Sequence, residues 1–298
     1  MGSPEIEILF GFDMETDVGS WTPFHEGLRY ATPLLVELFQ KHSITGTFYF
    51  VGASAREVPE SVLAVKAAGY EIGAHSLYHE TVGEAIFPIP GMVPLLPHEI
   101  APRLELNTRW IEEVCGVRPR SFRCPRLFGS TEVCRSLEEL GYISDASYPL
   151  YHFKDRLEPY HPHRDDWTRE GDLKLVEIPN FADLSIQSTD PYGRDRDQWP
   201  LFRTHSSAAL LERIDRHLAH LLQFGVKRRV LAFYFHPWEF WPMPQDFISF
   251  GEGAVRPNPF IVQNCGDYAL EQLDLLITGL KNRGGTFRTA ADIATDTR

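Results

Sequence analysis

Two histidines, His75 and His79, stand four residues apart directly after a short apolar run that ends at Ala74. At this spacing both imidazoles can face one metal ion if the chain turns helically after the strand. An acidic group at positions 13–17 follows another apolar run, and one of its carboxylates can complete three protein ligands. Three protein ligands plus water are the arrangement of a catalytic metal site, so the spacing favours metal-assisted chemistry.

Polar residues follow two further apolar runs. Arg123 ends a short run in the middle of the chain, and His236 follows a longer one, with Trp238 and Glu239 close behind it. In a parallel α/β barrel the chemistry lies where the strands end, so these residues are expected at the same end as the histidine pair. We expect Trp238 and Glu239 to contact the substrate, and Glu239 also to orient His236.

The elements that must position these residues are short strands alternating with helices. Eight apolar or β-branched runs are separated, in most cases, by segments of helical period. The runs are 6–12, 47–51, 70–74, 121–123, 142–144, 175–178, 230–235 and 286–288. This order predicts an α/β fold in which one distorted (β/α) barrel of seven to eight strands occupies residues 1–298 as a single domain.

Helix ends and long loops complete this outline. Gly69 and Gly116 are expected to end helices, Ser130 or Thr131 to begin one, and 206–224 to form the clearest amphipathic helix. Two long polar segments, 148–172 and 238–264, contain or adjoin several tryptophans, which favours a role as substrate walls. Exposed aromatic loops also favour a homo-oligomer, although no subunit number follows from the sequence.

Composition excludes several classes of function. Asp and Glu number 41 against 29 Lys and Arg, a net charge of −12, and no basic run is present, which argues against nucleic acids and anionic membranes as partners. No apolar stretch reaches about 18 residues, so no membrane span is expected. The start lacks the basic and apolar regions of a secretory signal, and the four cysteines form no C-x-x-C pair. We therefore expect a cytoplasmic protein with free thiols.

Five motifs, in order along the chain, resemble the polysaccharide deacetylase (NodB-homology, carbohydrate esterase 4) superfamily. They are FD with following acids at 12–17, GYEIGAHSLYH at 69–79, FRCP at 122–125, DASYP at 145–149 and FYFHPWE at 233–239. The first and last are more similar to the branch of cytosolic peptidoglycan-deacetylase-like, imidase-like and allantoinase-like proteins. The resemblance implies a distorted barrel, hydrolysis of a C–N acyl bond, and one divalent cation, zinc first, with cobalt, manganese or nickel as alternatives.

The resemblance also implies roles for individual residues. Asp13 matches the catalytic base, Arg123 the arginine that tethers this base, and His236 the general acid. His75 and His79 match the two metal-binding histidines.

The metal carboxylate departs from the superfamily pattern, which places an aspartate one or two positions after the base. This chain has Met14, then Glu15, with Asp17 beyond. Glu15 is the first choice because two steps along an extended strand return to the same face, and Asp17 is the second.

These residues predict a metal-dependent hydrolase of amides or imides, acting on a small molecule or a saccharide. The expected cytoplasmic location favours a small soluble substrate over a cell-wall polymer. Two alternatives stay open: a metal-free, allantoinase-like hydrolase, and a carbohydrate-binding barrel that has lost turnover.

Overall fold

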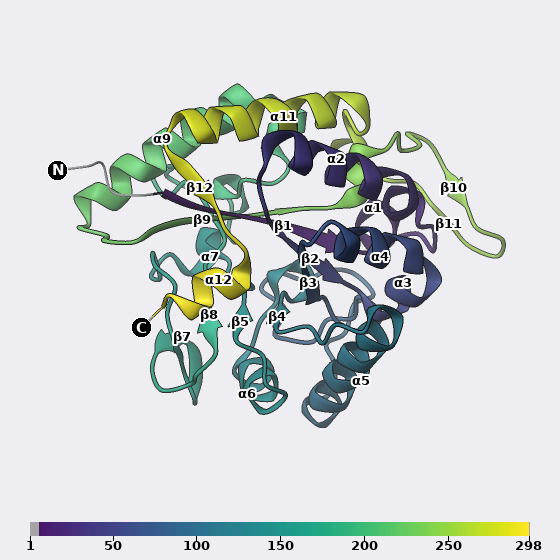
Figure 1. The fold of residues 1–298 in the computed structure, drawn as a ribbon, viewed down its shortest axis with the longest axis horizontal. Helices are drawn as coiled ribbons and strands as arrows, with labels where there is room; N and C mark the ends of the chain where they lie inside the picture. Colours follow the sequence, from purple (N-terminus) through teal and green to yellow (C-terminus); the bar gives the residue numbers. More distant parts are fainter. Residues whose placement is uncertain (1–5, 298) are drawn as a thin grey trace.

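A computed structural model describes residues 6–297 of the chain; residues 1–5, on which the expectation of no secretory signal partly rests, lie outside this range. Eight parallel strands form one curled sheet, which confirms the predicted barrel class (Figure 1). They are β1 (Ile6–Met14), β2 (Thr47–Phe50), β3 (Glu71–Ala74), β4 (Ser121–Phe122), β5 (Ser144–Asp145), β8 (Val176–Glu177), β9 (Arg229–Phe235) and β12 (Gly285–Phe287). Each begins and ends within one residue of a run predicted to be a strand, apart from β1, which ends two residues later, and β5, which begins two residues later.

The central strand of the sheet is β1, which pairs with β9 along one edge. Its other edge pairs first with β12 and then with β2, and the sheet continues through β3, β4, β5 and β8. The curl is nearly closed by Asn180, which bridges Pro149 on one side and Ala232 of β9 on the other. The carboxyl ends of the parallel strands therefore meet around one opening.

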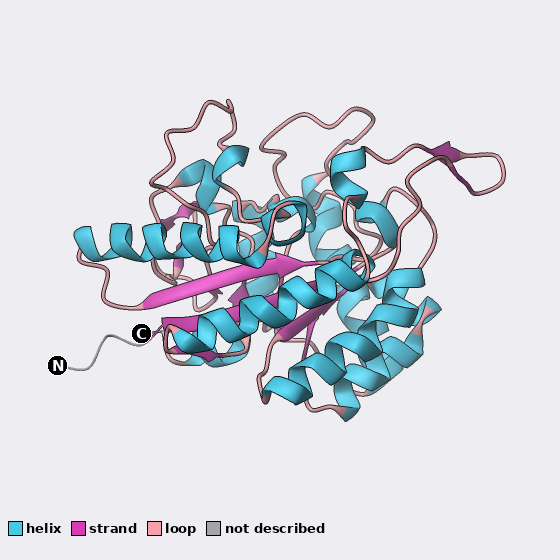
Figure 2. Cartoon of the chain, turned by 90° about the horizontal axis from the view of Figure 1, so that it is seen from above, coloured by secondary structure: helices cyan, strands magenta, loops and turns pink. Residues whose placement is uncertain are grey.

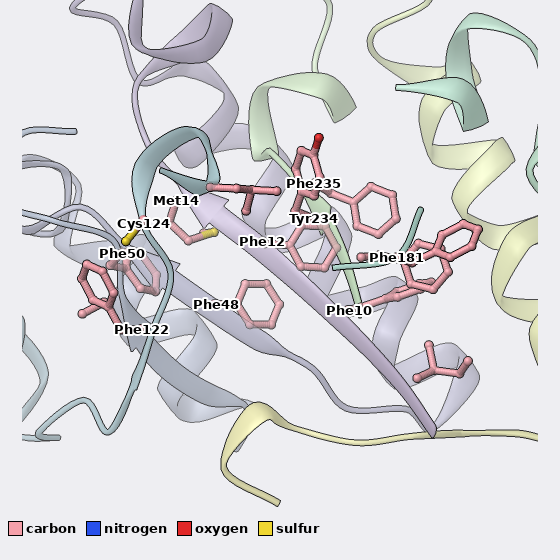
Figure 3. Close-up of a cluster of buried hydrophobic side chains, with 14 of the residues drawn as sticks. Phe10, Phe12, Met14, Phe48, Phe50, Phe122, Cys124, Phe181, Tyr234 and Phe235 are labelled. Atoms are coloured by element: carbon pink, nitrogen blue, oxygen red, sulfur yellow. The ribbon is translucent and has the colours of Figure 1, made fainter. Parts of the chain in front are cut away.

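Side chains alternate between the two faces of the sheet. Phe10 and Phe12 of β1 face outward and pack with aromatic rings of neighbouring strands and helices, among them Phe48 and Phe235 (Figure 3). Leu9, which precedes Phe10, belongs to a separate buried cluster inside the barrel. The other members of that inner cluster include Tyr49, Val176, Val230, Ala232, Ala290 and Ile293.

Helices cover the outside of the barrel, and the two long helices α9 and α11 lie side by side over β9 and β1 (Figures 1 and 2). As predicted, Ser130 and Ser206 accept hydrogen bonds at the starts of α6 and α9, and Gly116 ends α5 at φ 68°. The helices of four or more residues are α1 (Asp17–Ser20), α2 (Thr32–His42), α3 (Gly52–Glu57), α4 (Pro59–Ala67), α5 (Pro97–Cys115), α6 (Thr131–Glu139), α7 (Leu150–Phe153), α8 (Leu201–Thr204), α9 (Ser207–Gln223), α10 (Pro259–Val262), α11 (Asp267–Asn282) and α12 (Ala290–Thr295), with a π-helical turn at Gly27–Ala31 and a 3₁₀ turn at Pro237–Phe240.

The two long segments contain short elements of their own. Segment 148–172 forms α7 and a hairpin of β6 (Pro162–His163) and β7 (Asp166–Glu170). Segment 238–264 carries the hairpin of β10 (Ile248–Ser249) and β11 (Ala254–Val255), which projects from the body of the molecule (Figure 1). Within residues 6–297, none of the helices has the length and apolar character needed to cross a bilayer.

Candidate active site

The ionisable residues singled out in the sequence converge at the carboxyl ends of β1, β3, β4 and β9. A cavity of about 220 Å³ opens there, and its lining includes Asp13, Glu15, His75, His79, His236 and Trp238. These side chains come from strand ends far apart in the sequence, as expected for a barrel.

Glu15, His75 and His79 form a cluster that can hold a metal ion. One ligand atom from each lies within 4.8 Å of the others, and all three residues are buried. His79 Nε2 contacts the Glu15 carboxylate directly, while His75 Nε2 lies 4.0 Å from Glu15 Oε2 and 3.8 Å from Asp13 Oδ2. The donor set is two imidazoles and one carboxylate, a combination that zinc takes in catalytic sites.

The hydrogen bonding of His75 fits a metal. Its Nδ1 lies 2.7 Å from the carbonyl oxygen of Arg123, which can accept only, so Nδ1 carries the proton and Nε2 presents a lone pair. That Nε2 atom is buried and has no hydrogen-bond partner among residues 6–297. Burial also lowers the pKa of His75 to about 4, so the imidazole is neutral near pH 7, as a metal ligand must be.

The carboxylate of Glu15 is held in its ionised form. Burial alone would raise its pKa, but the neighbouring histidines, His79 above all, bring it well below its usual range. Trp238 Nε1 donates to Glu15 Oε1 at 3.1 Å and Ser20 Oγ donates to Oε2 at 3.2 Å, which orients the group toward the histidines.

The alternative carboxylate, Asp17, is engaged elsewhere. Its two oxygens accept hydrogen bonds from the backbone N–H groups of Glu26 and Gly27, at 2.8 and 2.9 Å. Burial raises its pKa to about 6, against these two hydrogen bonds. Asp17 therefore holds a turn of the chain, whereas Glu15 faces the histidine pair.

Asp13 is bound by a buried arginine that crosses the inside of the barrel. Arg123, fully buried, donates from Nη1 to Asp13 Oδ1 at 2.9 Å, from Nε to the carbonyl of Ala146 and from Nη2 to the carbonyl of Phe233. Gly11 makes this path possible, since a Cβ there would lie 2.3 Å from Nη1. Asp13 Oδ2 is left facing His75 and His236.

His236 lies on the opposite side of Asp13 from Arg123. Its Nδ1 donates to Glu239 Oε1 at 2.9 Å, and its Nε2 lies 4.0 Å from Asp13 Oδ2 and 3.9 Å from Glu15 Oε1. Burial would lower the pKa of His236, but the carboxylates of Glu15, Glu239 and Asp13 together raise it above the ordinary value. The site thus favours the imidazolium form of this residue.

Glu239 makes one of its two expected contacts, since it accepts from His236 Nδ1 but does not line the cavity. It is fully buried behind His236, where its carboxylate also accepts from Trp199 Nε1 at 2.9 Å and pairs with Arg203. It is absent from the cavity wall, which Trp238 does line. The expectation of substrate contact is therefore wrong for Glu239, because its oxygens are consumed by interior partners.

Much of the remaining wall comes from segments that the sequence did not single out, which contribute Trp21, Phe87, Ile89, Arg126 and Arg194. Segment 238–264, expected as a substrate wall, lines the cavity through Trp238 and Ile261, and the nearby Trp199 lines it as well. Segment 148–172, expected to form a substrate wall, supplies no lining residue although the structure describes it fully. Its Trp167 is buried against Tyr148 and Phe153, so its aromatic content serves packing instead.

Comparison with known proteins agrees with the resemblance seen in the sequence. Residues 17–144 match the family model "Polysaccharide deacetylase". Chitin deacetylase 1 of Cryptococcus neoformans is 28% identical over 102 residues, 34% of this chain and 20% of that protein. Peptidoglycan-N-acetylmuramic acid deacetylase PdaA of Bacillus subtilis is 25% identical over 112 residues, 37% of this chain and 39% of that protein. The aligned regions thus span well under half of both relatives.

Solved structures share the fold over nearly the whole chain. Puue allantoinase superposes with a TM-score of 0.62 at 17% identity, covering 99% of this chain and 90% of that one. A family 4 acetyl xylan esterase from Clostridium thermocellum, in complex with a cobalt ion, gives a TM-score of 0.51 at 16% identity, covering 97% and 90%. Residues 17–144 are thus similar to the polysaccharide deacetylase family, and the fold of nearly the whole chain matches the distorted barrel of the solved structures.

Proposed function

We propose that this protein is a metal-dependent hydrolase of C–N acyl bonds, with Glu15, His75 and His79 holding one divalent cation. The observation that carries the proposal is His75 Nε2, a buried nitrogen without a hydrogen-bond partner among the described residues, aimed at two carboxylates. A buried acceptor left unpaired costs about 1–3 kcal/mol, and a cation would remove that cost. Zinc suits the donors best, and cobalt, manganese or nickel are alternatives.

A cation at this position supplies Lewis acidity, which polarises a carbonyl group and lowers the pKa of water. Asp13, positioned by Arg123, takes the proton from the attacking water through Oδ2, the oxygen left without the arginine. His236, on the other side, delivers a proton to the leaving nitrogen from Nε2, while Glu239 holds Nδ1. The two groups are held 4.0 Å apart, so both can reach one tetrahedral centre.

The size of the site favours a compact substrate. A cavity of about 220 Å³ lies below the range of about 300–1,000 Å³ typical for drug-sized ligands. We therefore place a monomeric amide or imide ahead of a chitin or peptidoglycan chain.

Metal analysis combined with a substrate panel tests the proposal. Protein purified with zinc or cobalt should carry close to one ion per chain and hydrolyse a member of a panel of N-acetyl sugars, N-acyl amino acids, cyclic imides and ureides. His75→Ala should lose the ion and the activity, whereas His98→Ala, at an exposed position, should keep both. Full turnover by protein verified to be metal-free would refute the metal mechanism.

A metal-free hydrolase is a second candidate, favoured by the direct contact between His79 and Glu15, which pairs these groups without an ion. The fold similarity to Puue allantoinase agrees with either candidate. If this second proposal holds, chelated protein should retain its activity while Asp13→Asn abolishes it.

A further inference from the structure

Arg126 occupies an unusual position in the wall of the active-site cavity. It follows Pro125 at the end of the FRCP motif, and its backbone is left-handed, with φ 60° and ψ 13°. Leu127 after it is left-handed as well, also with φ 60°. A residue with a side chain is costly to hold in this region, by roughly 1–2 kcal/mol, and such strain gathers at functional sites. The backbone here is bent to present the arginine to the cavity.

The guanidinium of Arg126 has few protein partners. Its one hydrogen bond runs from Nη1 to the carbonyl oxygen of His79 at 3.4 Å, near the limit for such a bond, and the ring of Trp21 is 6.0 Å away. No carboxylate among residues 6–297 forms an ion pair with it. An arginine carries five N–H donors, so most of those on Arg126 are open to a ligand.

The two fully buried arginines near the site show the contrast. Arg123 binds Asp13 and two backbone carbonyls, and Arg203 binds Glu239 and two carbonyls. Both are saturated by the protein itself. Arg126 is partly buried and forms no such pair, since the attraction of Glu15 acts on it only from beyond ion-pair distance. A cation in a partly desolvated wall is stabilised further by an anion that arrives with the ligand.

The second cation of the wall, Arg194, is already compensated. It lies 3.6 Å from the carboxylate of Asp197 and stacks over the rings of Phe87 and Tyr151, each 5.2 Å away. The protein therefore neutralises the charge of Arg194 with its own carboxylate, whereas the charge of Arg126 remains available to a ligand.

We infer that Arg126 binds a carboxylate of the substrate, so that the substrate is a compact N-acyl amino acid or another small amide bearing a carboxylate. The contact with the His79 carbonyl places the guanidinium beside the candidate metal ligands, so one small molecule can reach both. A carboxylate matches the planar fork of a guanidinium, which can bind both its oxygens. This inference rests on the proposed function for the position of the scissile bond.

Paired ligands that differ by one charge test the inference. N-Hydroxysuccinamic acid carries a metal-binding hydroxamate and a carboxylate, and N-hydroxysuccinamide replaces that carboxylate with a neutral amide. Calorimetry on the zinc-loaded protein should show the acid binding about 10–100-fold more tightly, as expected for a charge-assisted hydrogen-bonded pair. Arg126→Met should remove this preference, and Arg126→Lys should keep part of it.

Two controls separate this inference from the loss of folding or of overall charge. Arg118→Met removes an exposed arginine that pairs with Glu112 and should leave the preference intact. Unchanged thermal midpoints of the Arg126 variants show that the fold is kept. Equal affinity of the wild type for acid and amide, or an undiminished preference in Arg126→Met, overturns the inference.

A second ligand pair distinguishes failure of the inference from failure of the proposed function. N-Acetylglycine and N-acetylglycinamide need no metal to reach Arg126, and Asp13→Asn prevents their turnover. If the protein takes up no zinc, the proposed metal site fails, yet a preference for N-acetylglycine that Arg126→Met removes still supports the inference. If neither compound of this pair binds, or both bind equally, the inference fails.

Discussion

The Glu15–His75–His79 cluster and the Cys134–Asp145–Glu177 cluster each bring three ligand atoms within 4.8 Å of one another, and all six residues are buried. They lie on opposite faces of the same sheet. The first faces the cavity at the carboxyl ends of the strands. The second is formed by a cross-strand pair on β5 and β8, covered by Cys134 of α6.

Protonation separates the two clusters further. In the second, Glu177 Oε1 accepts the backbone N–H groups of Ser147 and Tyr148 at 2.9 and 2.7 Å, and its other oxygen faces Asp145. Burial raises the pKa of Asp145 to about 7, and burial together with Asp145 raises that of Glu177. The thiol of Cys134 is also held well above its usual pKa by burial. The Cys134–Asp145–Glu177 cluster therefore binds protons, whereas the Glu15–His75–His79 cluster can bind a metal cation.

The difference shows that closeness of metal-ligating residues is a weak criterion by itself. Neutral imidazoles with an unpaired nitrogen and access from a cavity mark the first cluster. Two carboxyl groups sealed between strand and helix cannot both ionise, so they share a proton instead.

Removing one candidate ligand from each cluster tests which of the two binds the cation, and it should give the largest difference between them. His79→Ala should lower zinc affinity by more than the about 10–100-fold that loss of an outer partner costs. Cys134→Ser should leave zinc content at one ion per chain, measured by mass spectrometry on dialysed protein. The opposite result, with zinc kept in His79→Ala and lost in Cys134→Ser, would place the cation in the sealed cluster.

Amide variants of the two aspartates should separate catalysis from stability. Asp13→Asn should lower kcat by about 10²–10⁴-fold, the usual contribution of a general base, while keeping the metal. Asp145→Asn, remote from the cavity, should leave kcat within about threefold once its stability is allowed for. Steady-state kinetics at saturating substrate decide this, and a comparable loss of kcat in both variants would contradict it.

The smallest expected effect concerns the pH dependence of stability. Because the folded state holds the Asp145–Glu177 proton to a higher pH than the unfolded chain, stability from this pair is complete below about pH 4 and is lost as the pH rises through about 7. The slope is at most about 1.4 kcal/mol per pH unit for one proton. Glu177→Gln should flatten the curve of unfolding free energy against pH from urea denaturation.

Glu60→Gln provides the matched control for this measurement, since Glu60 pairs with Arg29 at the surface. Its curve should run parallel to that of the wild type. A Glu177→Gln curve as steep as the wild-type curve would show that the buried pair does not share a proton.

Most of the fold could be predicted from the sequence because most strands lie in apolar or β-branched runs that are separated by segments of helical period. The orientation of Glu15 toward the histidine pair could also be expected, since two steps along an extended strand return to the face of Asp13. Asp17 differs because the strand ends at Met14 and the turn beyond it directs this carboxylate to the N–H groups of Glu26 and Gly27. The strand positions and the orientation of Glu15 both depend on residues that are neighbours along the chain, so a single sequence is enough to predict them.

The rest of the site depends on contacts between distant segments. Arg126 and Trp199 reach the cavity through turns whose direction no periodicity encodes. Segment 148–172 was expected at the cavity for its aromatic residues, but Trp167 is consumed by packing. In the sequence Glu239 is a polar residue close to the candidate general acid, His236. Only its ion pair with Arg203, which is distant in the sequence, shows that its carboxylate points into the protein interior.

Arg123, which crosses the barrel beside Gly11, limits the routes by which molecules can enter and leave the site. Below Asp13 the interior is filled by Arg123, Tyr49 and Leu9, and α12 adds Ile293 to the same inner cluster. Among residues 6–297 these side chains fill the barrel axis, so under the proposed function the acid and the amine leave through the same mouth by which the substrate enters. The substrate and both products then share a single passage.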